Sequence, residues 1–578
     1  MRRMLAHLML LGLLTITAMP LVWLSNSLFG RQNVFPPLRR DWLECIIHLP
    51  FQTEYANACR EVALQNGWSS AVWFSSVAFY ISLALLFLAS LLLWNSSQQS
   101  EYQVRGRRLF KGRKAWRQLK HRFKKISGSS SIRLFGVNIP TRVHLRHWLL
   151  FGAVGSGKTV FIWSYLNALK VSGKTARSLV LDVKGDFIEA LKLPNLDGTL
   201  TAPALLNPCD KRSLEWWIGA DLTGVPEARE FTKKFLSKSQ SEAFWAKATG
   251  NVMLAVIRSL QIECGRNWSW AELSDRINAP PDQLLNWANQ YYSPAVKILE
   301  SKDNETATSV LINFATDFAA ISDLAAYWDG LTSTDKFSIN KWLSFQDRHP
   351  NIILGWDASA AEMCAAWAGA LVDLIGLKVS SPKFATSPGI NLILDEFAQL
   401  PKMDGILQAI DVGRSKGVSV LLGAQSFSQL RGIYGPRAES FKSIMGNIVF
   451  AQLAPGQDAK DASEFLGDRV IRERQVSTSK SKGGGSSNIS WVEKTSPLVM
   501  PHEFGSKIGP NKSGISVIYS PIGMDAYLLD VPYPTLEPFR APFLAKEPSD
   551  PYRAKNHGTQ RQKTPASNPF KKILDGRC

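Results

Sequence analysis

One short segment carries the residue types that bind nucleotide phosphates. It fits the pattern G-x-x-x-x-G-K-[ST] and consists of Gly152, Ala153, Val154, Gly155, Ser156, Gly157, Lys158 and Thr159. Backbone amides of such a loop converge on an anion, and the N-terminus of the following helix adds its dipole. We expect Lys158 to reach the β- and γ-phosphates and the Thr159 hydroxyl to bind Mg²⁺. The segment therefore predicts a site for ATP and Mg²⁺.

The flanks of this loop support the prediction. The apolar residues 148–151 precede it as a short strand would, and residues 160–166 follow with a helical pattern. A chance match in a surface loop is the alternative, and the strand–loop–helix context disfavours it. Residues 172–175 also read SGKT, but Ala168 stands where the first glycine is required.

A second segment completes the pattern of a nucleotide site. Residues 390–394 form an apolar run that ends in Asp395 and Glu396. Asp395 suits a carboxylate that binds Mg²⁺ through water, and Glu396 is placed to activate the attacking water as a general base. Acids after a strand are also common caps of the next turn, so the assignment depends on the pair that they form with the phosphate loop.

Two further polar residues follow at the ends of later elements. Arg414 closes the helix after Asp395, and Gln425 closes the next strand. A guanidinium can stabilise the charge of phosphoryl transfer at a neighbour's γ-phosphate, and an amide can sense whether that phosphate is present. The alternatives are charge complementation of a helix C-terminus for Arg414 and a loop hydrogen bond for Gln425. The residues alone favour neither.

From about residue 130 the chain alternates between apolar strands and amphipathic helices. This order predicts an α/β fold with a mainly parallel sheet covered on both faces. The expected strands are residues 147–151, 179–183, 351–356, 391–394, 418–423 and 447–453.

Residues 222–345 have a different character, because apolar residues recur there at helical spacing throughout. Ser269 and Glu272 resemble a capping box at the start of a helix. We therefore expect an all-α domain inserted into the α/β core. Its aromatic residues are expected to form core rather than platforms for nucleic-acid bases; they include Trp245, Trp268, Trp270, Tyr291 and Tyr292.

Two N-terminal stretches lack Asp, Glu, Lys and Arg entirely, namely residues 4–24 and 68–94. Each is long enough to cross a bilayer as a helix, which takes about 20 apolar residues. Two transmembrane helices are expected, with a cleaved signal peptide as the alternative for the first stretch. In either case the segment between the two stretches lies outside the cytoplasm.

The segment after the second stretch is strongly basic. Within residues 101–125 the only acid is Glu101. The basic residues there are Arg105, Arg107, Arg108, Lys111, Arg113, Lys114, Arg117, Lys120, Arg122, Lys124 and Lys125. The positive-inside rule then predicts that this segment and everything after it lie in the cytoplasm, and with two spans the N-terminus lies there too. Contact with DNA or anionic lipid is an open alternative role for this segment, and the net charge of +19 permits a polyanionic partner.

The cysteines divide according to that topology. Cys45 and Cys59 fall in the external loop, where they can pair, although the sequence leaves open whether they do. Cys209, Cys264, Cys364 and Cys578 fall on the reducing side. Further along, residues 477–487 are rich in Gly and Ser and are expected to be a mobile loop. Residues from about 546 onward are Pro-rich and basic, and they are expected to be disordered.

These motifs together resemble those of the type IV coupling proteins of the TraD type, which are RecA-like P-loop ATPases of conjugative type IV secretion systems. The resemblance covers most of the chain. It includes the two hydrophobic stretches, the phosphate loop, the LDVKGD segment of residues 181–186, the LNPCD segment of residues 206–210, the helical insert, LDEF at 394–397 and GAQS at 423–426. Val183 stands where the family usually has proline.

The resemblance implies a place in the bacterial inner membrane, with both termini cytoplasmic, a function and a set of roles. It implies a ring hexamer with a central channel, in which Arg414 is a trans arginine finger and Gln425 a coupling residue. The insert would engage DNA-bound partners. The ATPase would couple a relaxase–single-stranded DNA complex to a type IV secretion channel during conjugative DNA transfer. A double-stranded DNA pump of the chromosome-partition type and a receptor for protein substrates are the alternatives.

The expected division of the chain has eight parts. They are a transmembrane helix (1–26), a periplasmic loop (27–69), a second transmembrane helix (70–95), a basic juxtamembrane linker (96–130), the first part of the nucleotide-binding domain (131–221), the all-α insert (222–345), the second part of the nucleotide-binding domain (346–542) and a basic disordered tail (543–578).

Overall fold

The computed structural model describes residues 54–65, 101–171, 176–236, 243–299, 304–329, 335–385, 389–481 and 484–549. Both expected transmembrane helices and Cys45 lie outside the described residues, so these expectations stay predictions. The chain divides into two compact units. The first comprises Met1–Arg105 and Val470–Thr495, and the second comprises Gly106–Arg469 and Ser496–Cys578.

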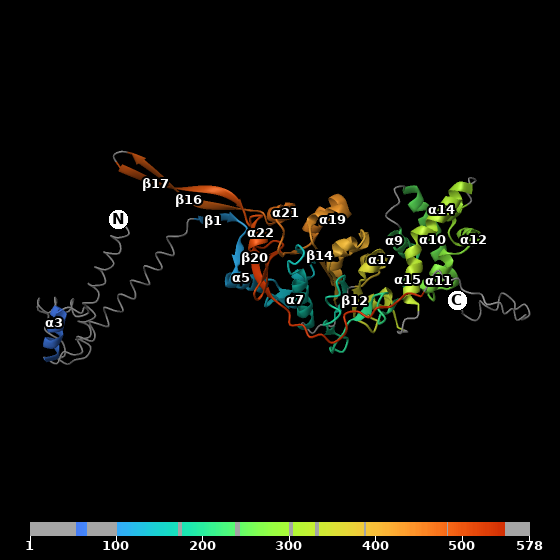
Figure 1. Ribbon diagram of the computed structural model, residues 1–578, viewed down its shortest axis with the longest axis horizontal. Coiled ribbons are helices and arrows are strands. Elements are labelled where there is room, and N and C mark those ends of the chain that lie inside the picture. The colour runs from blue at the N-terminus through green and yellow to red at the C-terminus, as the bar shows by residue number, and fades with distance from the viewer. Residues whose placement is uncertain are drawn as a thin grey trace, which may run out of the picture. The chain divides into compact units, whose positions relative to one another are not determined.

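The second unit is built on a large mixed sheet of eleven strands (Figure 1). Its order is β2-β20-β19-β15-β5-β14-β13-β6-β12-β9, with β18 paired to β19. The strands from β15 to β9 run parallel to their neighbours, whereas β19 is antiparallel to β15 and to β20. The bounds are β2 (Leu109–Lys111), β5 (Trp148–Phe151), β6 (Arg177–Asp182), β9 (Ala204–Leu206), β12 (Asn351–Gly355), β13 (Ile390–Leu394), β14 (Val418–Ala424), β15 (Asn447–Phe450), β18 (Gly509–Asn511), β19 (Gly514–Pro521) and β20 (Ala526–Pro532).

All six expected strands are present, as β5, β6, β12, β13, β14 and β15, which confirms the α/β fold with a mainly parallel sheet. The antiparallel edge was not expected. The parallel strands are fully buried apolar runs because helices cover both of their faces. Successive side chains along a strand point to opposite faces of the sheet. Trp148 and Leu150 join the core beside α7 (Lys158–Val171), whereas Leu149 and Phe151 join the core beside α17 (Ala361–Ser380).

The expected insert is helical from α9 to α15 and lies beside α17 (Figure 1). Its longer helices are α9 (Val225–Phe235), α10 (Ala243–Glu263), α11 (Trp270–Ile277), α12 (Pro281–Tyr291), α14 (Asn304–Asp317) and α15 (Ala319–Trp328). The capping box of Ser269 and Glu272 starts α11 as expected. Trp268 and Trp270 are buried, which agrees with a core role. The same apolar core continues from these helices to the sheet, so the insert is packed firmly on it.

A buried carboxylate ties the two ends of the insert together. Asp221, at the end of α8 (Ile218–Asp221), accepts hydrogen bonds from Ser338 Oγ (2.8 Å), Ile339 N (2.7 Å) and Asn340 N (2.9 Å). These residues start α16 (Ile339–Leu343), whose N-terminal amides favour a negative charge. Close in sequence to these hydrogen bonds of Asp221, β10 (Glu215–Trp216) pairs in parallel with β11 (Lys336–Phe337).

Two stretches in the described part are long and apolar enough to cross a membrane, Ala307–Trp328 and Ala358–Ser380. Both contribute buried residues to the core of the second unit, Trp328 and Trp367 among them. They therefore serve as core helices here.

The basic segment expected to be a linker is structured. It contains β1 (Glu101–Gly106), β2 and α5 (Gly112–Lys124). α5 buries Ala115, Leu119 and Phe123, which recur every four residues on one face, while its basic residues lie outside that face. The count of charges alone does not reveal this apolar stripe.

The Gly/Ser-rich segment is also structured where it is described, which corrects the expected mobile loop. β16 (Asp468–Ser481) and β17 (Gly484–Pro497) form a three-stranded sheet with β1, in the order β1-β16-β17. In the first unit Tyr102 and Trp491 contact each other edge to face at 5.4 Å. Arg472 donates to the Tyr102 hydroxyl (3.0 Å). Such cross-strand contacts stabilise a sheet that its glycines and serines alone would not.

Residues 533–549, which we call the strap, run from β20 along the second unit to the insert (Figure 1). Arg540 donates to Ile188 O (2.5 Å), and Leu544 N donates to Asp210 Oδ2 (3.1 Å). Lys546 Nζ donates to Tyr327 O at the end of α15. Residues 543–549, at the start of the expected disordered tail, are thus held by hydrogen bonds to the folded core.

Candidate functional site

The phosphate loop joins β5 to α7, and its glycines are required by geometry. Gly155 (φ +74°) and Gly157 (φ +92°) have left-handed backbones, which strain any other residue. A Cβ on Gly157 would lie 2.4 Å from Ile515 Cγ2. A Cβ on Gly152 would lie 2.3 Å from the Ser156 hydroxyl. The loop therefore curls tightly over the N-terminus of α7, as a phosphate cradle must.

Lys158 begins α7 and is almost fully buried, with 4% of its side chain exposed. Its Nζ donates to Gly152 O (2.7 Å) and to Ala153 O (3.3 Å). Burial lowers the pKa of Lys158, and the charges of Glu396 and Asp395 oppose that shift. The ammonium thus lies inside the curve of its own loop.

The carboxyl ends of the parallel strands meet at one edge of the sheet, where this loop also lies. Asp395 and Glu396 follow β13, and Gln425 follows β14, which lies between β13 and β5. Burial raises the pKa of Asp395 to about 6, and the neighbouring charge of Glu396 adds to the shift. Gly423 keeps the space beside Asp395 open, because a Cβ there would lie 3.0 Å from Asp395 Oδ1.

The oxygens at this edge fit Mg²⁺. Thr159 Oγ1 donates to Asp186 Oδ2 (3.3 Å), so a hydroxyl and a carboxylate lie together beside the loop. Asp395 supplies a second, buried carboxylate on the neighbouring strand. Mg²⁺ prefers such hard oxygens and keeps several waters, so one or two protein ligands are enough when phosphates supply others. The predicted metal residues Thr159 and Asp395 both lie at this edge of the sheet.

Glu396 is the point where the site's polar side chains converge. Its side chain is 2% exposed, and its backbone is left-handed (φ +53°). Lys184 Nζ lies 3.1 Å and Lys158 Nζ 3.7 Å from Glu396 Oε1. Gln425 Nε2 donates to Glu396 Oε2 (2.9 Å). The structure thus brings together three of the four predicted catalytic residues, Lys158, Glu396 and Gln425.

Arg414 lies elsewhere. It follows α18 (Asp404–Gly413) in the short helix η4 (Arg414–Lys416), is exposed, and precedes the amino end of β14. Gln425 lies just beyond the other end of that strand, and seven residues of strand span roughly 20 Å. Arg414 therefore lies at the opposite edge of the sheet from the phosphate loop of its own chain.

Residues 181–186 contribute to the site although no role was predicted for their side chains. They follow β6, the strand next to β13, and so arrive at the same edge. Lys184 contacts Glu396, and Asp186 contacts Thr159. Asp182 shapes the turn between them, and burial raises its pKa to about 7. The signal in the sequence was a pair of acids around a lysine and a glycine directly after a buried strand.

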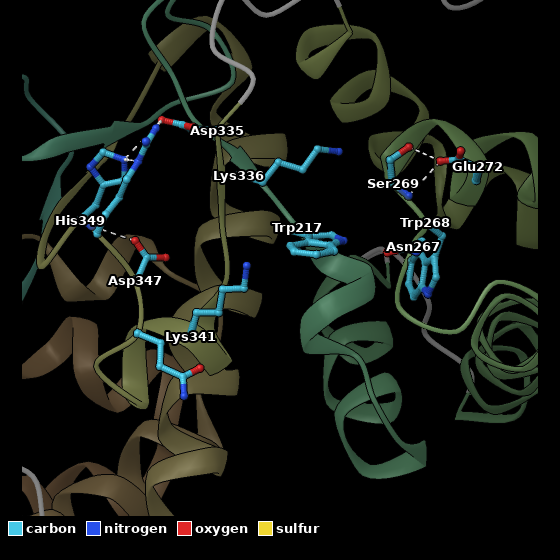
Figure 2. A pocket seen from close by; sticks show the side chains of 12 residues that line it. Trp217, Asn267, Trp268, Ser269, Glu272, Asp335, Lys336, Lys341, Asp347 and His349 are labelled. Atoms are coloured by element: carbon cyan, nitrogen blue, oxygen red, sulfur yellow. Dashed lines mark hydrogen bonds and ion pairs between the residues drawn. The ribbon is translucent and has the colours of Figure 1, made fainter. Parts of the chain in front are cut away.

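A separate cleft of roughly 710 Å³ lies between the insert and the sheet domain (Figure 2). Lys341 Nζ lies 4.8 Å from the centre of the Trp217 ring, and Figure 2 shows Lys336 on the other side of that ring. Lys336 forms an ion pair with Glu215 (2.9 Å). The contact of Lys341 with the indole is a cation–π interaction, which helps to hold α16, at the end of the insert, against the segment that precedes α8.

Comparison with known proteins gives a consistent result. Residues 131–525 match the family described as type IV secretion-system coupling protein DNA-binding domain. The chain is similar to the coupling protein TraD of Escherichia coli K12, with 24% identity over 417 residues. This match covers 70% of the chain and 55% of TraD, so it spans about half of that relative. A shorter match links it to the type IV secretion system-coupling protein VirD4 of Bartonella henselae, with 35% identity over 116 residues, 19% of this chain and 18% of VirD4.

Solved structures show the same fold. The bacterial conjugative coupling protein TrwBdeltaN70, in an unbound form, matches with a TM-score of 0.61 and 20% identity. The match covers 77% of this chain and 97% of that one. The plasmid coupling protein TrwB in complex with ADP and Mg²⁺ matches with a TM-score of 0.60 and 20% identity, over 77% of this chain and 98% of that one.

Proposed function

Because the chain belongs to the type IV secretion-system coupling protein family, we propose that it is an ATPase that couples a relaxase–single-stranded DNA complex to a type IV secretion channel in conjugation. The observation that carries the enzymatic part is the convergence of Lys158, Lys184 and Gln425 on Glu396, beside the phosphate loop. A chain that only bound nucleotide would not need a buried carboxylate in that position.

The proposed reaction is hydrolysis of the γ-phosphate of ATP. The water oxygen forms a bond to the γ-phosphorus, and the bond to the β–γ bridging oxygen breaks with its electron pair leaving on ADP. The water proton passes to Glu396 and then to solvent. Lys158 neutralises charge on the phosphates. Thr159 and Asp395 would hold Mg²⁺, which would supply further neutralisation.

The position of Arg414 suits action across a subunit interface. An exposed guanidinium at the far edge of the sheet is out of reach of its own phosphate loop. In a ring of like-oriented subunits, one edge of each subunit faces the nucleotide edge of the next. We therefore assign Arg414 as a trans arginine finger in a homo-hexamer, with Gln425 sensing the γ-phosphate beside Glu396.

The membrane anchor and the partners complete the proposal. Residues 1–26 and 70–95 would cross the inner membrane, with both termini in the cytoplasm. The insert would engage relaxosome proteins, and the channel of the ring would hold single-stranded DNA. The net charge of +19 favours such a polyanion.

The ATPase rate of the purified full chain tests this proposal in parallel samples with single-stranded DNA, double-stranded DNA or no DNA. We expect stimulation by single-stranded DNA above that by duplex. Stronger stimulation by duplex would instead favour a double-stranded DNA pump. Hydrolysis that neither form changes would favour a receptor for protein substrates.

A further inference from the structure

Lys184 is held by a turn that a buried carboxylate shapes. Asp182 Oδ1 accepts a hydrogen bond from Asp186 N (3.0 Å), and Asp182 Oδ2 accepts one from Phe187 N (2.8 Å). Gly185 takes the left-handed backbone that this turn needs (φ +79°). The backbone around Lys184 is therefore fixed relative to the end of β6.

The sheet register then directs Lys184 to Glu396. β6 and β13 are parallel neighbours in which Leu181 pairs with Leu394. Lys184 and Glu396 thus leave adjacent strands at nearly the same level, and Lys184 Nζ reaches Glu396 Oε1 at 3.1 Å. Lys184 is 44% exposed at its side chain, whereas Glu396 is 2% exposed.

A buried carboxylate needs a partner of opposite charge, because an uncompensated ion in the interior is costly. Two lysines share this task at Glu396 Oε1, but Lys158 is also the residue that binds phosphate. When ATP draws Lys158 to its phosphates, Lys184 is the cation that stays with the carboxylate.

We infer that Lys184 is a positioning residue for ATP hydrolysis, an inference that rests on the proposed function. Lys184 holds Oε1 of Glu396 in place. The other oxygen, Oε2, which accepts the hydrogen bond from Gln425, then faces the attacking water. Lys184 itself touches neither the nucleotide nor the water. Gln425 can then release Oε2 to the water once it contacts the γ-phosphate.

The test compares Lys184→Met, which keeps the length of the side chain and removes the charge, with Lys184→Arg. The full chain is assayed for kcat, KM, nucleotide Kd and thermal stability, and Lys460→Met on the exposed face of α21 (Gln457–Leu466) is the control. We expect Lys184→Met to lower kcat about 10- to 100-fold, part of the 10²–10⁴ that a positioned base contributes. Nucleotide Kd and stability stay near wild type. Lys184→Arg restores most of the lost kcat.

A double variant separates positioning from other roles. If Lys184 acts through Glu396, adding Lys184→Met to Glu396→Gln causes no further loss, because the carboxylate that it positions is already gone. A multiplied loss in the double variant, or a Kd that weakens in step with kcat, overturns the inference. An unchanged kcat in Lys184→Met does so too. Absence of hydrolysis by the wild-type chain would instead overturn the proposed function.

Discussion

At the scale of single residues, the site is a set of charges that must be buried together. Lys158 and Glu396 are almost fully enclosed, and each lowers the cost of enclosing the other. Oppositely charged side chains that are buried together in this way cluster where a protein does chemistry. Their substitution should therefore separate binding from turnover.

Lys158→Ala and Asp395→Ala are each expected to abolish ATP hydrolysis and transfer, because they remove charge stabilisation at the phosphates and at Mg²⁺. Glu396→Gln should still bind ATP and turn it over about 10² to 10⁴ times more slowly, since only water activation is lost. A fluorescent ATP analogue measures binding, and phosphate release measures turnover. If Glu396→Gln bound no nucleotide, its assignment as general base would be wrong.

The raised pKa of Asp395 predicts that the stability of the fold depends on pH. Burial raises its pKa from 3.8 to about 6, so the folded state binds this proton more tightly than the unfolded state. The charged carboxylate therefore costs stability above pH 6, by about 3 kcal/mol, and the cost disappears as the pH falls from 6 to 3.8. Without nucleotide, Asp395→Asn should unfold at a higher temperature than wild type at pH 8.

That difference in unfolding temperature should stay nearly constant from pH 8 to about 6 and then shrink as the pH is lowered to 5. Asp411→Asn, at an exposed position on α18, is the matched control and should shift the unfolding temperature little at any pH. A stabilisation by Asp395→Asn that stays constant with pH would show that packing, not charge, is responsible.

At the scale of elements, the strap links the turn after β6 to the end of the insert. Arg540 donates to Ile188 O, directly after the turn that carries Lys184, and to Pro203 O, directly before β9. Arg540→Met should lower the free energy of unfolding by about 1.5–3 kcal/mol, because two backbone carbonyls lose a charged donor. Urea unfolding measures the change.

Arg437→Met provides the control for the strap. Arg437 forms an exposed ion pair with Asp404 at 3.5 Å, and such surface pairs contribute about 0–1 kcal/mol. An equal effect of both variants would mean that the strap lies on the surface without stabilising the core.

At the scale of the whole molecule, the position of Arg414 predicts that hydrolysis depends on assembly. Arg414→Ala should reduce turnover about 10³- to 10⁵-fold while nucleotide binding changes little. Lys158→Ala subunits retain Arg414, which can complete the site of a neighbour. Arg414→Ala subunits retain an intact phosphate loop. Mixing the two inactive variants should therefore restore part of the activity. If mixed rings form but hydrolysis does not recover at any ratio, Arg414 does not act across the interface and only complements the charge of a helix end.

The predicted topology can be tested on intact cells. Lys114 is exposed on α5, in the basic segment that should face the cytoplasm. A cysteine at position 114 should be protected from an impermeant thiol reagent, and one placed within residues 27–53 should react. Labelling of position 114 from outside would contradict the topology.

The sequence by itself determined the features that depend on a few consecutive residues. The glycines of the phosphate loop, the apolar runs of β5 and β13 and the capping box at Ser269 are all local signals. Local backbone geometry and burial dictate such residues wherever the segment lies, so a pattern of eight or fewer residues is enough to reveal them.

Tertiary structure alone decided which of these segments meet. Lys184 reaches Glu396 because β6 lies beside β13, and Gln425 reaches it because β14 lies on the other side. Arg414 lies at the opposite edge because it precedes β14, and β14 runs parallel to β5, which leads into the phosphate loop. The apolar stripe of α5 and the contacts of the strap became visible only against their partners. Strand order and packing depend on residues hundreds of positions apart, and no local pattern encodes them.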